Sequence, residues 1–246
     1  MDRTWIRVVR ERPEAPVRLV CFPHAGGAAS AFLPLGRRAG DDIEILAVQY
    51  PGRQDRYREP AVTELGQLAD RVADVLAGAV PGPFAFLGHS MGAVVAFEVT
   101  RRLERRGAPA PQVLFVSGRR APSLVREEDV HQRDDAGVLA EMKRLGGTDT
   151  DLLADPEVVE MIMPALRADY TAVETYRCDP PGAVVRSPIE VLIGDSDPRV
   201  SVAEAKDWAH HTTAGCGLRV FPGGHFYLTD RAAEVMAHIT ATLRLP

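Results

Sequence analysis

A serine lies at the centre of a glycine-flanked motif, Gly88-His89-Ser90-Met91-Gly92. The short apolar run Phe84–Leu87 precedes the motif and predicts a strand, and a helical pattern begins at Ala93. A serine at a sharp strand-to-helix turn has a strained backbone, so the residues two positions before and after it must lack bulk. The turn exposes the hydroxyl and directs the first N–H groups of the helix toward negative charge that forms there. We therefore predict that Ser90 is a catalytic nucleophile; a glycine-rich structural turn is the alternative.

A serine hydroxyl needs a base to remove its proton, and the base needs a partner to orient it. His225 follows the apolar run Leu218–Phe221 and is the predicted base. Two carboxylates, Asp195 and Asp197, compete for the orienting role after another apolar run. Pro198 restricts the preceding Asp197 to an extended conformation, whereas Asp195 can cap the turn through its own backbone. We favour Asp197, which gives a predicted catalytic set of Ser90, Asp197 and His225.

Acyl transfer through a serine also requires N–H donors for the oxyanion. The backbone N–H of Met91, directly after the nucleophile, is one predicted donor. A loop of small residues, Ala25-Gly26-Gly27, follows an early apolar run and lets backbone N–H groups approach a ligand. The N–H of Ala25 is the second predicted donor, and His24 is expected to brace this loop rather than to catalyse.

Alternating strands and helices must position these groups. The strands are expected as short apolar runs, which suit a mostly parallel sheet covered on both faces: Val17–Phe22, Ile43–Val48, Phe84–Leu87, Val113–Val116, Ile189–Ile193 and Leu218–Phe221. Helices are expected between them, at Val62–Leu76, from Ala93 to Val99 and beyond, at Val202–His211 and at Asp230–Leu243. This alternation predicts an α/β layered fold. We expect residues 1–246 to form a single domain.

One interval, approximately residues 120–185, is too long for a structureless loop. It contains helical patterns around Val138–Leu145 and Val158–Met163, and Pro164 suits the first turn of a third helix. A helical insertion above the carboxyl ends of the strands would cover the site as a lid. Met142, Met161 and Met163 are its predicted substrate-binding lining, although such methionines also commonly pack a helix onto the body.

The composition excludes several classes of function. The net charge of −5 gives no reason to expect nucleic acid or an anionic membrane as a partner. No run reaches the length of a membrane span, and the N-terminus has no secretory apolar core. The three cysteines are far apart and suggest neither disulfides nor zinc, which favours a cytoplasmic location. We expect no metal and no cofactor, and a monomer.

Six motifs together resemble type II thioesterases, the stand-alone editing enzymes of polyketide and nonribosomal peptide synthesis. They are Cys21-Phe22-Pro23-His24-Ala25-Gly26-Gly27, Gln49-Tyr50-Pro51-Gly52-Arg53, Gly88-His89-Ser90-Met91-Gly92, Ser117-Gly118-Arg119-Arg120-Ala121-Pro122, Leu166-Arg167-Ala168-Asp169-Tyr170 and Gly223-Gly224-His225-Phe226. The resemblance spans nearly the whole chain. It implies an α/β-hydrolase fold with a helical lid, and catalytic residues in the order Ser, Asp, His.

The resemblance also implies the substrate, an acyl group in thioester linkage to the phosphopantetheine arm of an acyl or peptidyl carrier protein. The reaction would remove aberrant or stalled acyl units from a synthase. Because carrier proteins are typically acidic, we expect a basic docking patch from Arg53, Arg56 and Arg58, or from Arg119 and Arg120; a solvated charged surface is the alternative.

Two other functions remain possible from the sequence. A lidded carboxylesterase or lipase-like hydrolase would use the same residues on oxygen esters. A catalytically silent binding protein of the same fold is the third candidate, since a fold does not determine a function.

Overall fold

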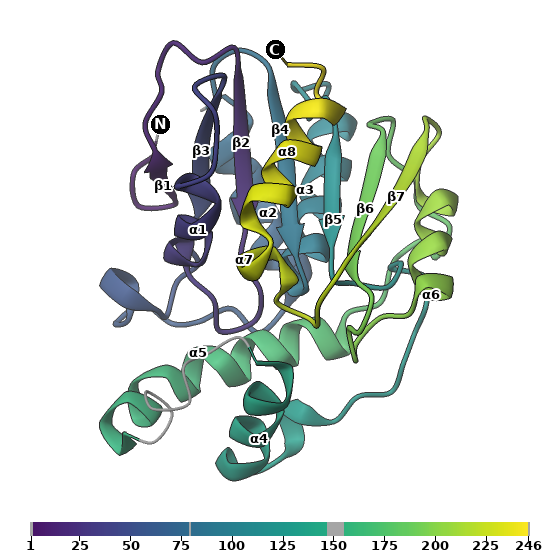
Figure 1. Cartoon of the computed structure of the whole chain (residues 1–246). Helices are drawn as coiled ribbons and strands as arrows, with labels where there is room; N and C mark the ends of the chain where they lie inside the picture. The colour runs from purple at the N-terminus through teal and green to yellow at the C-terminus, as the bar shows by residue number, and fades with distance from the viewer. Residues whose placement is uncertain (1, 79, 147–154, 246) are drawn as a thin grey trace.

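A seven-stranded sheet forms the centre of the protein (Figure 1). The computed structural model describes residues 2–78, 80–146 and 155–245. The strands lie in the order β1-β3-β2-β4-β5-β6-β7, and every pair from β3 to β7 is parallel. Their bounds are β1 Ile6–Arg10, β2 Val17–Phe22, β3 Ile43–Val48, β4 Phe84–His89, β5 Leu114–Ser117, β6 Ile189–Gly194 and β7 Cys216–Phe221. The predicted α/β class and the mostly parallel sheet are confirmed.

The edge strand β1 was not predicted from the sequence. It pairs antiparallel with β3, with Ile6 opposite Val48. Only Ile6 is fully buried in this strand, while Val8 is 45% exposed. An edge strand with one covered face carries a weaker apolar signal than the continuous runs of the central strands.

Helices cover both faces of the sheet (Figure 1). On one face α2 and α3 pack against β2, β4 and β5, and on the other face α1, α7 and α8 contact the opposite sides of the same strands. The bounds are α1 Leu33–Gly36, α2 Leu65–Leu76, α3 Met91–Arg105, α6 Val202–Lys206, α7 Tyr227–Asp230 and α8 Ala232–Thr242. The helix predicted at 202–211 ends early, because residues from Asp207 to His211 form a 3-10 turn, η5. Among the described residues, no helix combines the length and apolarity needed to cross a membrane.

The interval between β5 and β6 is helical, as the sequence predicts. It contains a short 3-10 turn η3 (Val130–Gln132) and the helices α4 (Asp135–Leu145) and α5 (Pro156–Thr175). Figure 1 shows α4 and α5 below the sheet, with α5 running beneath the carboxyl ends of the strands. The insertion has its own apolar cluster, made by Val130, Val138, Met163, Leu166 and Tyr170.

The prediction that Pro164 starts a separate helix is wrong, because Pro164 lies inside the 20-residue helix α5. A proline removes one helical hydrogen bond and crowds the carbonyl four residues earlier. Pro164 and Glu160 both lie on the exposed side of α5, where water can bind the freed carbonyl. The buried residues Met163 and Leu166 on the other side keep one continuous contact surface.

Candidate active site

The backbone at Ser90 is strained in the way that the glycine-flanked motif predicts. Ser90 has φ 55° and ψ −116°, between the end of β4 and the first residue of α3, Met91. A Cβ on Gly88 would lie 2.2 Å from the carbonyl oxygen of Gly92, and one on Gly92 would lie 2.0 Å from that of Phe22. Both positions therefore accept only glycine. The N–H of Met91 belongs to the first turn of α3, whose N–H groups have no partner within the helix.

His225 and Asp197 lie in contact at the ends of two neighbouring strands. The Nδ1 atom of His225 is 3.0 Å from Oδ1 and 2.9 Å from Oδ2 of Asp197. The side chains are 1% and 0% exposed, so the pair is shielded from water. A second hydrogen bond, from the N–H of Arg199 to Oδ1, holds the carboxylate in place. The geometry leaves Nε2 of His225 as the free ring nitrogen.

The competing carboxylate, Asp195, has a different environment. It is exposed and accepts hydrogen bonds from the N–H of Gly223 and the hydroxyl of Ser196. The backbone hydrogen bond from Gly223 is the main cause that lowers the pKa of Asp195. This carboxylate joins the loops that follow β6 and β7, while Asp197 is the one that contacts His225.

Ser90 and His225 line the same small pocket, with a volume of ≈ 40 Å³. The loop residues Ala25 and Gly26 form one wall of it. The other walls come from α4, α5 and the loops at the sheet edge: His24, Arg119, Met142, Leu145, Tyr170, Val173, Arg199 and Phe226. The structure therefore brings the predicted nucleophile, base and oxyanion loop to one place beneath the carboxyl edge of the sheet.

Two further histidines surround the base. The rings of His24 and His89 lie 5.8 Å apart, and His89 lies 5.0 Å from the ring of His225. Burial, followed by repulsion from the cationic forms of His225 and Arg53, lowers the pKa of His24 to about 3. Burial likewise holds the pKa of His89 well below its usual value, and its Nδ1 contacts the hydroxyl of Ser117 at 3.0 Å. Both rings stay neutral at pH 7, so they add no positive charge beside His225.

A second, larger pocket adjoins the first. It has a volume of ≈ 410 Å³ and shares His24, Gly26 and Met142 with the small pocket. Its walls are the loop Gly26–Ala31, the segment Gly52–Tyr57 and, from the helical insertion, Met142, Val158, Met161, Ile162, Ala165 and Leu166. The insertion therefore contributes mostly apolar side chains to a space that adjoins the pocket of the serine.

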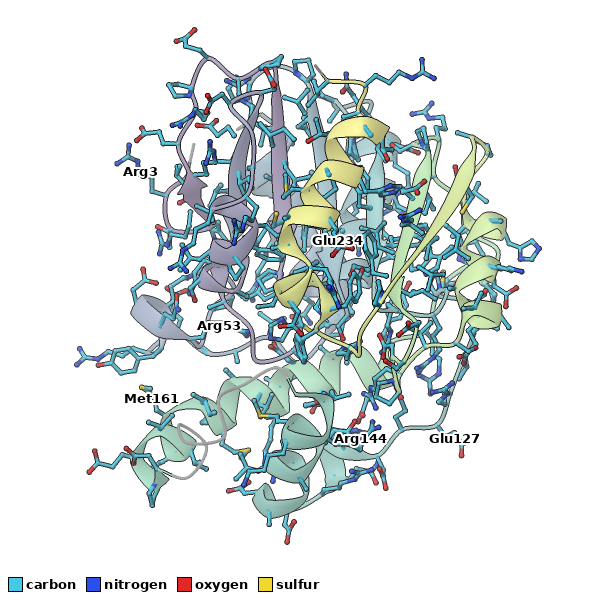
Figure 2. The ribbon with its side chains drawn as sticks, in the orientation of Figure 1. Arg3, Arg53, Glu127, Arg144, Met161 and Glu234 are labelled. Carbon is cyan, nitrogen blue, oxygen red and sulfur yellow. The ribbon has the colours of Figure 1, made fainter. Side chains whose placement is uncertain are left out.

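The three predicted lining methionines have different surroundings. Met142 lies between the two pockets, and Met161 lies at the rim of the larger one with 57% of its surface exposed. Figure 2 labels Met161 on the outer half of α5. Met163 is 5% exposed and packs in the apolar cluster between α4 and α5. Met163 thus has the helix-packing surroundings that were the alternative for these methionines.

The expected basic docking patch is wrong for four of its five arginines, which are buried. Arg53 and Arg56 are 7% and 5% exposed; the first pairs with Asp169 and the second with Glu59. Arg120 pairs with Glu128 at 2.7 Å. Arg119 borders the small pocket, and burial lowers its pKa to about 9. Only Arg58 of the five is exposed, beside the ring of Tyr57.

The buried pair of Arg53 and Asp169 was not predicted from the sequence. Both residues stand in motifs that carry the family resemblance, but neither motif indicates a contact between them. They lie 116 residues apart in the chain, and their pairing depends on α5 crossing beneath the sheet. A charged residue inside the otherwise apolar stripe of α5 was the available signal.

The fold and the site together define an α/β-hydrolase. The sheet is mostly parallel with helices on both faces, a strained serine follows β4, and a buried His–Asp pair follows β7 and β6. Residues 17–243 match the family model described as "Thioesterase domain". The chain belongs to the thioesterase family.

Related proteins agree with this assignment. The chain is 48% identical to the "Probable cadicidin biosynthesis thioesterase" of Streptomyces griseus, over 97% of this chain and 66% of that protein. It is 46% identical to "Thioesterase PikA5" of Streptomyces venezuelae, over 96% of this chain and 84% of that protein. These alignments include the elements that carry the site.

Solved structures give the same result. "The type II thioesterase BorB from the borrelidin biosynthetic cluster" superposes with a TM-score of 0.88 at 43% identity, and the match covers 96% of each chain. "RedJ-Thioesterase from the Prodiginine biosynthetic pathway in Streptomyces coelicolor" gives 0.87 at 36% identity, covering 94% of this chain and 92% of RedJ. The resemblance to type II thioesterases that the motifs indicate is confirmed, and the α/β-hydrolase fold with it.

Proposed function

We propose that this protein hydrolyses acyl thioesters carried on the phosphopantetheine arm of acyl or peptidyl carrier proteins, and so removes aberrant or stalled acyl units from a polyketide or nonribosomal peptide synthase. The observation that carries the proposal is the pocket where Ser90, His225 and the Ala25 loop meet, in a chain of the thioesterase family. Two similar solved structures support the substrate class: YbtT is described as a type II thioesterase from the yersiniabactin NRPS/PKS biosynthetic pathway, and ClbQ as coming from the colibactin NRPS/PKS pathway.

The reaction follows from the positions of the side chains. Ser90 Oγ attacks the thioester carbonyl carbon while Nε2 of His225 takes the hydroxyl proton. The negative charge that develops on the carbonyl oxygen is stabilised by the N–H groups of Met91 and Ala25. The C–S bond then breaks, and His225 returns the proton to the departing thiol of the carrier arm. Asp197 keeps the ring oriented through Nδ1 and stabilises its cationic form.

The second half of the reaction uses the same groups in the same order. Water enters the place that the thiol has left, and His225 removes a proton from it as it attacks the acyl-serine carbonyl. The acid product then departs and Ser90 regains its proton. The lowered pKa values of His24 and His89 make both rings weak proton acceptors, so we assign the exchange of protons in this cycle to His225.

The larger pocket supports a place for the acyl chain. Its walls from Met142, Ile162, Ala165 and Leu166 are apolar, and transferring each methylene of an acyl chain from water to such a surface contributes about 0.8 kcal/mol. We assign Met142 to the junction between the serine and the chain-binding space, and Met161 to its rim. The helical insertion then acts as a lid over the acyl group.

The remaining parts of the proposal concern context. The carrier protein is the partner, the enzyme works as a monomer in the cytoplasm, and it needs no cofactor or metal. Hydrolysis of oxygen esters by a carboxylesterase or lipase-like enzyme was the alternative, and the family assignment favours thioesters over it.

The test is a panel of carrier proteins loaded with different acyl groups. Each is incubated with the enzyme, and unloading is followed by the mass of the carrier. The proposal predicts unloading that requires Ser90, and faster turnover of a thioester than of the matched oxygen ester. Unloading at the same rate by Ser90→Ala would contradict it.

A further inference from the structure

Helix α5 makes direct contact with the loop that carries the Ala25 N–H, through a buried carboxylate. Asp169 of α5 is 1% exposed and accepts a hydrogen bond of 2.7 Å from the N–H of Gly26. The same carboxylate accepts hydrogen bonds from Nη1 and Nη2 of Arg53, at 2.6 and 2.9 Å. Arg53 also donates to the carbonyl oxygen of Gly27 at 3.0 Å. Figure 2 shows Arg53 between the sheet and α5, where the two parts of the molecule meet.

The loop that is held in this way is a tight turn. The N–H of Gly27 donates to the carbonyl of His24 at 2.9 Å, and Gly26 has φ +75°. In the four-residue turn, only the third residue, Gly26, has a positive φ, which identifies a type II turn. A type II turn differs from a type I turn by a rotation of the central peptide, here the one between Ala25 and Gly26. The N–H of that central peptide is the one that Asp169 binds. The carboxylate thus selects one of the two orientations that the turn can adopt.

A side-chain contact reinforces the hydrogen bond. A Cβ on Gly26 would lie 2.7 Å from Cδ1 of Leu166, so α5 packs directly on the turn. Leu166 and Asp169 are three residues apart and lie on one face of the helix. Two neighbouring turns of α5 therefore contact the backbone at Gly26, directly after Ala25.

The charge of Asp169 requires the arginine. A lone carboxylate beside a developing oxyanion would repel it, since both charges lie in a region with little water. The two-pronged contact with Arg53 cancels that charge and leaves the carboxylate as a neutralised acceptor for the Gly26 N–H. The ring of Tyr50, 5.2 Å from the guanidinium, covers Arg53 from the other side.

We propose that Asp169 and Arg53 are positioning residues for the oxyanion site, which fix the type II turn at Ala25 and Gly26 in place and so keep the Ala25 N–H, which belongs to the preceding peptide, directed at the thioester oxygen. This inference rests on the proposed function, because it assigns a role within the same reaction. It makes the insertion part of the catalytic geometry, since the C-terminal half of α5 supplies the acceptor. A helix tied in this way cannot leave the site without releasing the turn.

The test compares three variants that differ in the charges and hydrogen-bonding groups that remain buried at positions 53 and 169. Asp169→Asn keeps one acceptor but places an amide N–H₂ against the donors of Arg53. Arg53→Lys keeps the cation without the two-pronged contact. Arg53→Met with Asp169→Leu removes both charges together, which buried ion pairs commonly tolerate without loss of folding. Glu98→Gln is the matched control, because Glu98 is also buried in a pair, with Arg101 and Arg102, and belongs to neither pocket wall described above.

The measurements are kcat, KM and the Kd of an alkyl boronic acid, whose tetrahedral adduct with Ser90 places an oxygen among the oxyanion donors. Complete loss of one such donor lowers kcat by about 10²- to 10³-fold. For a displaced donor we expect kcat to fall by about 10- to 100-fold in Asp169→Asn and in the double variant, and less in Arg53→Lys. The boronic acid Kd should rise by the same factor, with KM within about threefold of the wild type. Glu98→Gln should keep kcat within about twofold.

The outcomes separate this inference from the proposed function. If the wild type hydrolyses the thioester through Ser90, and Asp169→Asn or the double variant is folded and keeps both kcat and boronic acid affinity, the positioning role is wrong while the function stands. If activity falls only in proportion to the folded fraction, as measured by circular dichroism, the pair is merely structural and the inference is again overturned. A wild type without Ser90-dependent turnover would instead contradict the function itself.

Discussion

Replacing each of the two neighbouring carboxylates, Asp195 and Asp197, by asparagine removes the same charge from positions two residues apart. The structure predicts very different results. Both oxygens of Asp197 face Nδ1 of His225, at 2.9 and 3.0 Å, and its side chain is 0% exposed. In Asp197→Asn the amide N–H₂ can donate to Nδ1, which shifts the ring proton to Nε2. That nitrogen then cannot accept the proton of Ser90.

The magnitude follows from this change of tautomer. Losing the carboxylate of a Ser–His–Asp set with its geometry intact lowers kcat by about 10⁴-fold. At 1.36 kcal/mol for each factor of ten, this loss corresponds to about 5.4 kcal/mol of the activation barrier. Asp195→Asn keeps an oxygen that can accept the Gly223 N–H on an exposed loop, so we expect kcat within about threefold of the wild type.

The assay is steady-state hydrolysis of an acyl N-acetylcysteamine thioester, with the thiol detected by a chromogenic disulfide. Circular dichroism of both variants verifies that each is folded. Asp197→Asn within tenfold of the wild-type kcat, or a larger loss in Asp195→Asn, would refute the assignment of Asp197 to His225.

Three further predictions concern the glycine-flanked turn at Ser90, the larger pocket and His24. Gly92→Ala should lower the free energy of unfolding by about 3 kcal/mol or more in urea, because its Cβ would lie 2.0 Å from a backbone oxygen, whereas Gly78→Ala, with open space around it, should change it by less than about 0.5 kcal/mol. Ile162→Trp should lower kcat/KM for octanoyl thioesters at least about tenfold and leave acetyl thioesters within about twofold, and an equal loss on both would argue against the acyl pocket. As the pH falls below 6.5 the unfolded chain protonates His24 before the folded protein does, because the folded pKa is about 3; the stability from this neutral histidine is complete above pH 6.5 and is lost toward pH 3. Between pH 6 and pH 5, the free energy of unfolding measured in urea should therefore fall by about 1.2 kcal/mol less in His24→Asn than in the wild type, and an identical fall would contradict the neutral state of His24 in the folded protein.

Local signals made much of the fold predictable. Each central strand is a mostly apolar run, such as Val17–Phe22 with its single arginine. The strained serine requires the glycines that the sequence places two residues before and after it. The contact between His225 and Asp197 could be expected because both follow strands, and parallel neighbouring strands end at the same edge. The catalytic roles of these residues remain predictions.

Features that depend on contacts between distant parts of the chain could not be predicted from the sequence. The arginines at positions 53, 56, 119 and 120 were expected on the surface, either in a docking patch or as solvated charges, yet the fold buries all four. Asp169, the acceptor that neutralises Arg53, lies 116 residues further along the chain, so the apolar stripe around Asp169 could indicate a buried charge but not its partner. The prediction that Pro164 begins a helix failed for a similar reason. Whether a proline can lie inside a helix depends on whether water can reach the carbonyl that loses its hydrogen bond, and the fold decides this.

The central claim is that Ser90 becomes acylated by a thioester. The most direct measurement mixes the enzyme with an acyl-loaded carrier protein, quenches the reaction with acid within milliseconds and maps the acyl group by peptide mass spectrometry. We predict one added acyl mass on the peptide that contains Ser90, formed before the free acid appears and absent from Ser90→Ala. Release of the acid by the wild type with no acyl-serine at any time, together with undiminished hydrolysis by Ser90→Ala, would contradict the account.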